Sequence, residues 1–456
     1  MDPFQPSSEK PAEDTQTYSG AEIIVKILEN QGIEIVTGMP GGAALPFYDA
    51  LRCSEKTRHV LARHEQGGGF IAQGMSRVLG TPQVCLATSG PGATNLLTAV
   101  ADAKLDSIPL VAITGQVPQL MIGTDAFQEV DTYGLSLPIT KHNFLVRSAR
   151  ELLYVIPEAF RIAASGRPGP VWVDVPKDVQ VERITVEAWP EVAVADAPPA
   201  VDTDQIRLAA EMINAAERPL LYVGGGAVSS TGAADTLRQL VDNTNMHAVS
   251  TLMGLGVLPT DDPRALGMLG MHGALYTHSV LDRSDLLVVV GARFDDRATG
   301  KVAEFCPDAK VIHIDIDPSE HNKLKQAHMA IAGDVGTTLE ALIPLVENNQ
   351  RESWAAEIAD YRKRMPLKTP DIDKPTSPYG IIKATFDAAG QGAIVTTDVG
   401  QHQMWAAQVY PFERPRQWLT SGGLGTMGFG LPAAIGAALA APDKTIVCFT
   451  GDGSIL

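Results

Sequence analysis

The sequence has few cysteines, few aromatic residues and no segment that resembles a secretion signal. Only 4 of its 456 residues are cysteine, and 6% are aromatic. The cysteines are far apart and form no C-x-x-C pair, which argues against a disulfide framework or a zinc knuckle. Residues 1–19 are rich in Pro, Ser, Glu and Asp and have no apolar core. We therefore expect a cytoplasmic protein without a secretory signal and with a disordered N-terminal tail at residues 1–17.

Positive charge is also scarce, and this limits the classes of partner. The chain has 36 Lys and Arg against 53 Asp and Glu, a formal net charge of −17. We therefore expect neither nucleic acid nor an anionic membrane as a partner. The least charged stretch, residues 417–442, is rich in glycine and contains Pro432. It is interpreted as a buried helix with a glycine-rich start, not as a membrane span.

What the sequence does contain is a regular alternation of short apolar runs and helical patterns, which favours α/β layers with parallel sheets. At about 150 residues per domain, 456 residues suggest about three domains. The predicted strands form three groups: 33–36, 83–87, 110–114 and 171–175; 219–223, 247–250, 286–290 and 311–316; and 393–397 with 445–450. The predicted helices of the first group are 21–30, 68–78, 94–103 and 152–164.

Two proline-rich stretches divide these groups and predict the domain limits. We predict a first domain at 18–181, a linker at 182–204, a central domain at 205–345, a second linker at 346–378 and a third domain at 379–456. The third domain is short and stops at the tip of a strand, which would leave half a sheet with an unpaired edge. We therefore expect it to be incomplete and the sequence to be C-terminally truncated.

Two motifs in the first domain are candidates for chemistry. Glu65 follows an apolar run and stands at the start of a helix. Such a carboxylate is either a charge that complements the helix dipole or a partly buried acid with a raised pKa that moves a proton. Residues 89–95 form a turn that feeds a helix, and its N–H groups either face a ligand or only close the turn.

The central domain has three strand ends that suit a nucleotide. Gly224-Gly225-Gly226 follows one strand, although it lacks the full G-x-G-x-x-G spacing. A second strand runs into residues 291–297, and a third ends at Asp315-Ile316-Asp317. Acids at strand ends can bind ribose hydroxyls, and a nearby arginine can bind phosphate. Together the three features favour a nucleotide site.

The third domain offers two further candidates. Asp452, in the run Gly451-Asp452-Gly453-Ser454, is a hard oxygen ligand suited to Mg²⁺, with glycine N–H groups near a diphosphate. A turn without function is the common alternative. His402 follows another strand, at the end where open α/β sheets bind ligands, although a lone histidine is more often structural.

Taken together, these residues resemble the large catalytic subunit of the acetolactate synthase (acetohydroxyacid synthase) family, bacterial type, whose members use thiamine diphosphate. The runs 127–129 and 291–297 are typical of this branch and not of pyruvate decarboxylases. The resemblance implies an α/β fold with three doubly wound parallel-sheet domains of the thiamine-diphosphate enzyme type, the third incomplete. The matching motifs are residues 63–67, 88–95, 115–118, 122–129, 165–170, 268–273, 291–297, 400–405 and 421–430.

The resemblance also implies the reaction. In this family the first domain binds the pyrimidine of thiamine diphosphate, the central domain binds FAD, and the third binds the diphosphate through Mg²⁺. Glu65 would bond the pyrimidine ring nitrogen and promote loss of the thiazolium proton. Pyruvate would lose CO₂, and the remaining two carbons would add to pyruvate or 2-ketobutyrate. The products, 2-acetolactate and 2-aceto-2-hydroxybutyrate, lead to valine, leucine and isoleucine.

Further site residues are carried over from the same resemblance. Phe127 and Gln128 would line the substrate site, Arg297 would hold the carboxylate of the second keto acid, and Met427 would wedge between the two rings of thiamine diphosphate. The other contacts implied for that cofactor are Gly42, Pro91, Asn95, Gly400, Gln401, His402, Gly425, Gly451, Gly453 and Ser454, with Asp452 on Mg²⁺. Those implied for FAD are Arg167, Gly224, Gly225, Gly226, Thr251, Leu252, Met271, His272, Gly291, Arg293, Asp315, Ile316 and Asp334.

The family implies partners as well: a homodimer through the cofactor site and a small regulatory subunit. One departure concerns the metal, because the asparagine that closes the family's Mg²⁺ motif is absent from the sequence. With Asp452 as the only side-chain ligand, the metal would be weakly held, and we expect little or no activity from the chain as written. The alternatives are another carboligase or decarboxylase of the superfamily, such as one using glyoxylate or oxalyl-CoA, and a catalytically inactive FAD-binding fragment. Glu65 argues against glyoxylate carboligases, which lack its equivalent.

Overall fold

The computed structural model describes residues 16–455, and its first sheet is built from buried apolar runs. Six parallel strands lie in the order β3-β2-β4-β5-β7-β6. Apart from β3 and β6 at the two edges, they are buried along their whole length, because helices cover both faces. The strands are β2 (Ile35–Gly38), β3 (Arg58–Leu61), β4 (Gln83–Ala87), β5 (Leu110–Gln116), β6 (His142–Leu145) and β7 (Pro170–Pro176).

The helices of this unit divide its apolar core into two clusters, one on each face of the sheet. Side chains of α1 and α6 fill one cluster, and those of α3 and α4 fill the other, around Trp172. The short strands β1 (Thr17–Ser19) and β8 (Arg183–Thr185) pair antiparallel beside the sheet. The helices are α1 (Gly20–Asn30), α2 (Leu45–Arg52), α3 (Glu65–Leu79), α4 (Pro91–Asp106), α5 (Thr132–Ser136), α6 (Ala149–Ala164) and α7 (Lys177–Val181), with the 3₁₀ turns η1 (Gln119–Met121) and η2 (Leu137–Ile139).

The second sheet repeats this architecture. Its parallel order is β11-β10-β9-β12-β13-β14, again with an apolar cluster on each face. The strands are β9 (Pro219–Val223), β10 (His247–Ser250), β11 (Ala265–Met268), β12 (Leu286–Val290), β13 (Lys310–Asp315) and β14 (Met329–Ala332). The helical segments are α8 (Thr203–Ala215), α9 (Gly225–Ser229), α10 (Ala233–Thr244), η3 (Leu252–Gly254), α11 (Leu275–Arg283), α12 (Asp296–Thr299), η4 (Val302–Glu304), η5 (Pro318–Glu320), α13 (Val335–Leu342) and η6 (Ile343–Leu345).

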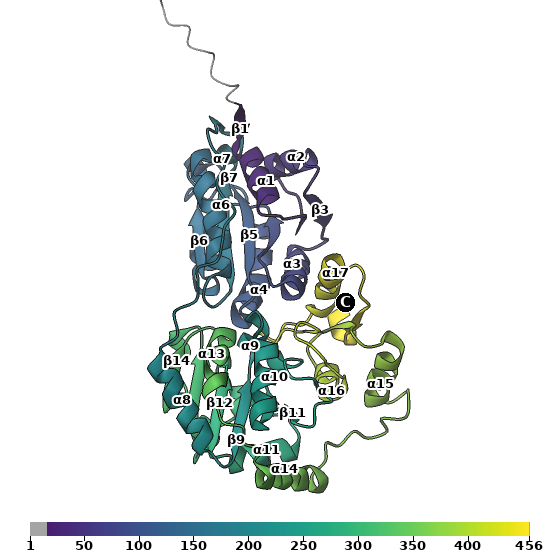
Figure 1. Ribbon diagram of the computed structural model, residues 1–456. Helices are drawn as coiled ribbons and strands as arrows, with labels where there is room; N and C mark the ends of the chain where they lie inside the picture. Colours follow the sequence, from purple (N-terminus) through teal and green to yellow (C-terminus); the bar gives the residue numbers. More distant parts are fainter. Residues whose placement is uncertain (1–15, 456) are drawn as a thin grey trace, which may run out of the picture.

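The third sheet has three parallel strands in the order β16-β15-β17. Its helix α17 packs along α3 of the first unit, and the two lie side by side in Figure 1. Within residues 16–455, no helix has both the length and the apolar character that a bilayer span requires. The elements are α14 (Glu352–Arg364), α15 (Pro378–Ala389), β15 (Ile394–Thr397), α16 (Gln401–Val409), β16 (Trp418–Leu419), α17 (Gly430–Ala440), β17 (Ile446–Phe449) and α18 (Asp452–Ile455).

The predicted α/β class with parallel sheets is confirmed, and several predicted elements are shifted. The strand predicted at 33–36 begins at Ile35, because the chain first closes α1: Gly32 takes a φ of +76°, and Ile33 N–H donates to Leu28 O. The helix with a glycine-rich start that is predicted within 417–442 is confirmed, because a glycine-rich loop leads into α17, which has a buried face. The first residues of the segment form β16. The stretch predicted as a linker at 182–204 opens with β8.

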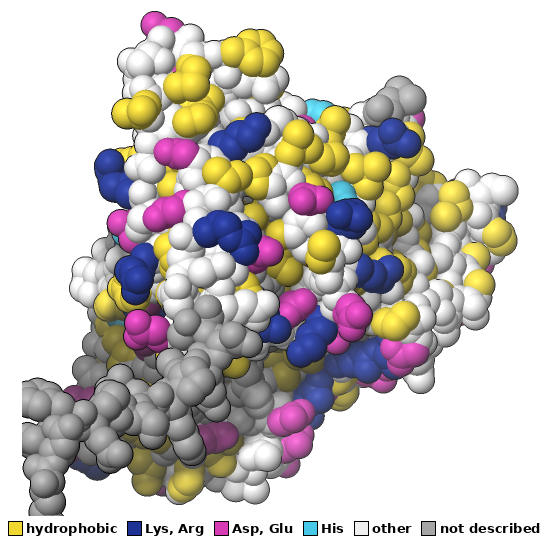
Figure 2. Space-filling model, turned by 90° about the horizontal axis from the view of Figure 1, so that it is seen from above, with side chains coloured by type: hydrophobic (Ala, Val, Ile, Leu, Met, Phe, Trp, Pro, Cys, Tyr) yellow, Lys and Arg dark blue, Asp and Glu magenta, His cyan; other side chains and the backbone are white. Residues whose placement is uncertain are grey.

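The predicted domain limits remain predictions. The three parallel sheets lie within 18–181, 205–345 and 379–456, whereas the β1–β8 pair joins residues 17–19 to 183–185 and α14 falls inside the stretch 346–378. Residues 1–15 of the predicted N-terminal tail lie outside the described residues, whereas Thr17 begins β1. Seen from the end where the first unit lies, basic and acidic side chains are interspersed among exposed hydrophobic ones (Figure 2).

Candidate active site

Glu65 is a buried carboxylate at the start of α3, where the chain leaves β3. Its residue is 7% exposed, and its Oε2 accepts a hydrogen bond of 2.9 Å from Asn95 Nδ2 on α4. A Cβ built on Gly92 would lie 3.3 Å from Glu65 Oε1, so the start of α4 also faces this carboxylate. Pro91 is the first residue of α4, and Gly42 has open space around its Cα. The structure thus brings Glu65 and Asn95 into direct contact.

Gln128 lies against the turn that precedes α4. Its backbone φ is +60°, and a Cβ on Gly90 would come within 2.7 Å of Gln128 O. Only glycine fits at position 90, which also has a positive φ of +58°. The neighbouring Phe127 is 86% exposed, so the apolar ring projects from the surface.

A buried network that sequence reasoning missed anchors the segment that carries Phe127 and Gln128. Gln116 Nε2 donates to Val130 O at 3.0 Å and to Asp174 Oδ2 at 3.0 Å, and Thr132 Oγ1 also donates to Asp174. Burial raises the pKa of Asp174 to about 6. The polar residues that end β5 and β7 in otherwise apolar runs were the sequence signal for this network.

In the third unit, a group of predicted residues surrounds His402. A Cβ on Gly400 would lie 3.1 Å from His402 Cε1, and one on Gly451 would lie 3.4 Å from it. A Cβ on Gly453 would lie 3.2 Å from Met427 Cε. The glycines therefore leave hollows that any other residue would fill.

We call this group, Gly400, His402, Met427, Gly451, Gly453 and Ser454, the His402 cradle. Two of its polar atoms lack a hydrogen-bond partner among the described residues. These are His402 Nε2 and Ser454 Oγ, which are both buried. Burial lowers the pKa of His402, which favours its neutral form. Gln401 is exposed at the start of α16, and Met427 is 54% exposed. Buried polar atoms without partners indicate a missing hydrogen-bonding group.

The candidate metal ligand Asp452 is exposed at the start of α18. In residues 16–455, no group of three or more His, Cys, Asp or Glu side chains is arranged to hold a metal ion. A protein cage for a metal is therefore excluded for this part of the chain. Mg²⁺ bound by one carboxylate together with phosphate oxygens fits this donor set, because Mg²⁺ is usually held in that way.

Another carboxylate, Asp398, was not predicted, although it directly follows β15 and precedes Gly400 by two residues. Its Oδ1 accepts the N–H of Gly428 at 2.6 Å, and its Oδ2 accepts the N–H of Gly430 at 3.0 Å and the hydroxyl of Thr450 at 3.3 Å. Asp398 thereby holds the end of the glycine-rich loop against the strand that leads to Gly451.

The residues predicted for FAD converge on one cavity of about 1240 Å³ between the three units. This exceeds the volume of about 300–1,000 Å³ that is typical of sites for small ligands. Thr251 Oγ1, on this wall, is buried without a partner in the described chain. The predicted residues that line the cavity are Arg167, Gly224, Gly225, Gly226, Thr251, Leu252, Met271, His272, Gly291, Arg293, Asp315, Ile316 and Asp334, and Gly425 and Arg297 join them.

Gly224 and Gly226 have a packing role that sequence reasoning did not foresee. A Cβ on Gly224 would lie 2.1 Å from Gly291 O, and one on Gly226 would lie 2.7 Å from Gly291 Cα. The loops after β9 and β12 touch backbone to backbone, and Gly226 N–H donates to Gly291 O at 3.0 Å. These glycines shape the cavity floor by letting two loops meet.

Charged groups of both signs line the same cavity. Arg167 Nη1 pairs with Glu320 at 2.7 Å and with Asp317 at 3.2 Å, which ties the first unit to the second. Burial raises the pKa of Asp315 to about 6. Asp334 is engaged as the cap of α13, where it accepts Thr337 N–H at 3.1 Å.

The predicted residues thus form three groups in a single chain: Glu65 with Asn95, the His402 cradle, and the large cavity. Among the described residues, no hydrogen bond or ion pair links Glu65 to His402 or Asp452. Arg297 lines the large cavity, and its side chain is 73% exposed. The structure does not bring Arg297 and Glu65 together within the chain.

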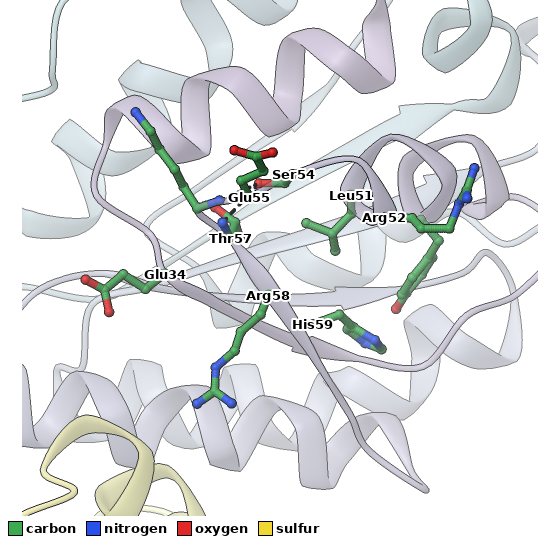
Figure 3. A pocket seen from close by; sticks show the side chains of 10 residues that line it. Glu34, Leu51, Arg52, Ser54, Glu55, Thr57, Arg58 and His59 are labelled. Carbon is green, nitrogen blue, oxygen red and sulfur yellow. Dashed lines mark hydrogen bonds between the residues drawn. The ribbon is translucent and has the colours of Figure 1, made fainter.

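A second cavity, of about 520 Å³, lies along β3 at the edge of the first sheet (Figure 3). None of the predicted site residues lines it. The charged ends of Glu34, Glu55 and Arg58 point in different directions, so they do not converge on one ligand.

Comparison with known proteins shows the family to which the chain belongs. Three family profiles match: the thiamine pyrophosphate enzyme N-terminal TPP binding domain at residues 18–135, the central domain at 206–342 and the C-terminal TPP binding domain at 398–456. A relative named acetolactate synthase isozyme 1 large subunit, from Escherichia coli, is 60% identical over 96% of this chain and 78% of its own length. The chain belongs to the acetolactate synthase family.

Two other relatives in the acetolactate synthase family lie further away. The acetolactate synthase of Mycobacterium bovis is 48% identical over 96% of this chain and 72% of its own length. The chloroplastic acetolactate synthase of Arabidopsis thaliana is 46% identical over 97% of this chain and 67% of its own length. The predicted resemblance to the large subunit is confirmed.

Proposed function

We propose that the chain carries out thiamine-diphosphate-dependent decarboxylation of pyruvate and carboligation to a second 2-keto acid, in branched-chain amino acid biosynthesis. The family membership supports this activity. The observation that connects this activity with specific atoms is the buried carboxylate of Glu65. It lies at the start of α3 and accepts a hydrogen bond from Asn95 near the start of α4. A buried acid in contact with one amide is suited to share a proton with a ring nitrogen.

The residues present fit thiamine diphosphate. The unpartnered His402 Nε2 and Ser454 Oγ supply polar contacts in a cradle of glycines, and Glu65 supplies the acid. When bound, this cofactor supplies the electron sink that lets a 2-keto acid lose CO₂. Glu65 holds the proton at the pyrimidine nitrogen, while Asn95 fixes the direction of its carboxylate. Phe127 and Met427 offer exposed apolar surface that would exclude water from the reacting carbons once a second subunit covers it.

We assign the remaining ligands by fit to the same framework. The 1240 Å³ cavity, with the unpartnered Thr251 hydroxyl and Arg167, suits FAD. Asp452 supplies one carboxylate to Mg²⁺, whose other ligands would come from the diphosphate and water. Gln128 lines the pyruvate site, and Arg297, with its exposed guanidinium, binds the carboxylate of the second keto acid, pyruvate or 2-ketobutyrate.

A second copy of the chain completes this proposed site. Glu65 and the His402 cradle share no hydrogen bond or ion pair within the described chain, and Phe127 and Met427, which we assign to the same site, are exposed. A homodimer in which Glu65 of one subunit faces the cradle of the other accounts for both facts. We also propose a small regulatory subunit as a partner and a cytoplasmic location.

The test is product formation by the purified chain with pyruvate, FAD, thiamine diphosphate and excess Mg²⁺. We expect acetolactate to form only slowly, because Asp452 as the only side-chain ligand would hold Mg²⁺ weakly, and its formation to depend on thiamine diphosphate. Glyoxylate offered in place of pyruvate separates the proposal from a glyoxylate carboligase. Turnover without thiamine diphosphate, or a preference for glyoxylate, would contradict the proposed activity.

A further inference from the structure

The first unit makes hydrogen bonds to the glycine-rich loop 421–429, which contains Met427. Asp106, at the end of α4, accepts the N–H of Gly423 at 2.7 Å and that of Gly422 at 3.0 Å. Asp102, one turn earlier, accepts the hydroxyl of Ser421 and, at 3.3 Å, that of Thr426. The start of the loop is therefore bonded to a different unit from the one to which it belongs in sequence.

Arg77 joins these two carboxylates from α3. Its Nη2 pairs with Asp106 at 2.8 Å and with Asp102 at 3.2 Å, and all three side chains are at most 5% exposed. The same guanidinium stacks over the ring of Phe429, 4.9 Å from the ring centroid, at the far end of the loop. Arg77 thus contacts the far end of the segment directly and its start through the two carboxylates.

The loop has little room to move between these contacts. A Cβ on Gly422 would lie 2.4 Å from Met253 Sδ of the central unit, and one on Gly423 would lie 2.9 Å from Leu105 Cβ. The three units meet at these two glycines. The other end of the loop is held by Asp398, and Met427 stands between the two anchor points.

Burying three charges here is costly, so the cluster is a poor device for stability alone. Burial and the neighbouring charge of Asp106 raise the pKa of Asp102, which shows that cost. Buried polar networks that are fully bonded impose one geometry on the parts they join. This cluster imposes a geometry on the segment that carries Met427.

We propose that Asp106, Asp102 and Arg77 are positioning residues for the thiamine-diphosphate site, because they fix the loop 421–429 and hence the place of Met427. This inference rests on the proposed function. It assigns to the first unit a second task besides supplying Glu65: orienting the third unit's half of the site.

The test compares Asp106→Ala with a matched control, Asp285→Ala. Asp285 also holds two successive N–H groups, those of Glu217 at 2.8 Å and Arg218 at 2.9 Å, at the opposite end of the central sheet. Thiamine-diphosphate affinity is measured by titration calorimetry with Mg²⁺ present, and amide hydrogen exchange is followed in the peptide that covers 421–430. Thermal unfolding and flavin content report whether each variant is folded.

We expect Asp106→Ala to weaken thiamine-diphosphate binding about tenfold or more and to speed exchange in the loop, while Asp285→Ala changes neither. Asp106→Glu, which keeps the charge, should recover part of the affinity. Ser421→Ala, a small change in the loop itself, should act in the same direction as Asp106→Ala. Equal affinity and equal loop exchange in wild type and Asp106→Ala would overturn the inference. Failure of the folded wild-type chain to bind thiamine diphosphate would instead overturn the proposed function.

Discussion

Helices α3 and α17 meet through glycines, and the consequence for stability can be worked out from two positions on one helix. A Cβ at Gly74 would lie 2.3 Å from Ala433 O on α17, whereas ordinary contacts begin at 3.4 Å. Gly74→Ala would therefore push the helices apart by roughly 1 Å, and overpacking of this kind costs about 1–3 kcal/mol. At Gly67, on the same helix, a Cβ would have no neighbouring atom within 4 Å.

The two alanine variants share the same gain in helix propensity, about 1 kcal/mol over glycine. Their difference in unfolding free energy isolates the clash, and we expect Gly74→Ala to be less stable than Gly67→Ala by about 1–3 kcal/mol. Thermal unfolding measures this, since about 1 kcal/mol corresponds to about 2–4 °C in domains of 150–250 residues. Equal unfolding temperatures for the two variants would show that α3 and α17 do not pack through Gly74.

Three further outcomes follow from buried polar groups. Asp174 has a folded pKa of about 6, above its unfolded value of about 3.9. The unfolding free energy of wild type therefore falls as pH rises through that interval. Denaturant titrations should show that the difference in unfolding free energy between wild type and Asp174→Asn shrinks from pH 4.5 to pH 7.5. A difference that stays constant would contradict the burial argument. Arg351 donates to the carbonyls of Ile213 and Thr244 at 2.7 and 2.8 Å, so Arg351→Ala should lower the unfolding free energy by about 1–3 kcal/mol, whereas an unchanged value would mean that water replaces these bonds freely. Arg167→Ala removes the ion pairs to Glu320 and Asp317 beside the large cavity. The purified variant should therefore retain less flavin than wild type, as measured by absorbance. An unchanged flavin content would show that Arg167 does not contribute to flavin binding.

The sequence predicted those features that depend on residues close together in the chain. The apolar runs at β4, β9, β10 and β12 predicted strands whose limits match the observed ones, because strands buried on both faces read as continuous apolar runs. For the edge strand β3, only the apolar run that ends at Leu61 was recognised and its limits were not predicted, since Arg58 and His59 interrupt the apolar pattern. The residues at the strand ends of the central unit, which were predicted to form one nucleotide site, line one cavity.

What the sequence could not supply was contact between distant segments. Asp102 and Asp106 are isolated acids on a helix of small residues. Nothing in their spacing indicates that Asp106 accepts N–H groups, and Asp102 hydroxyl groups, from residues more than 300 positions away. Likewise, no local pattern indicated that Gly224 and Gly226, which line the large cavity as predicted, also lie against the backbone of Gly291. Both facts depend on how the units pack, which no local pattern encodes.

The proton role of Glu65 is the central claim, and its most direct test is exchange of the thiazolium C2 proton of bound thiamine diphosphate in D₂O, followed by quenched-flow NMR. We expect Glu65→Gln to slow this exchange by about 10²–10⁴-fold while thiamine diphosphate stays bound. Glu34→Gln, at the unrelated second cavity, serves as the control and should exchange like wild type. An unchanged exchange rate in Glu65→Gln with the cofactor saturated would contradict the account.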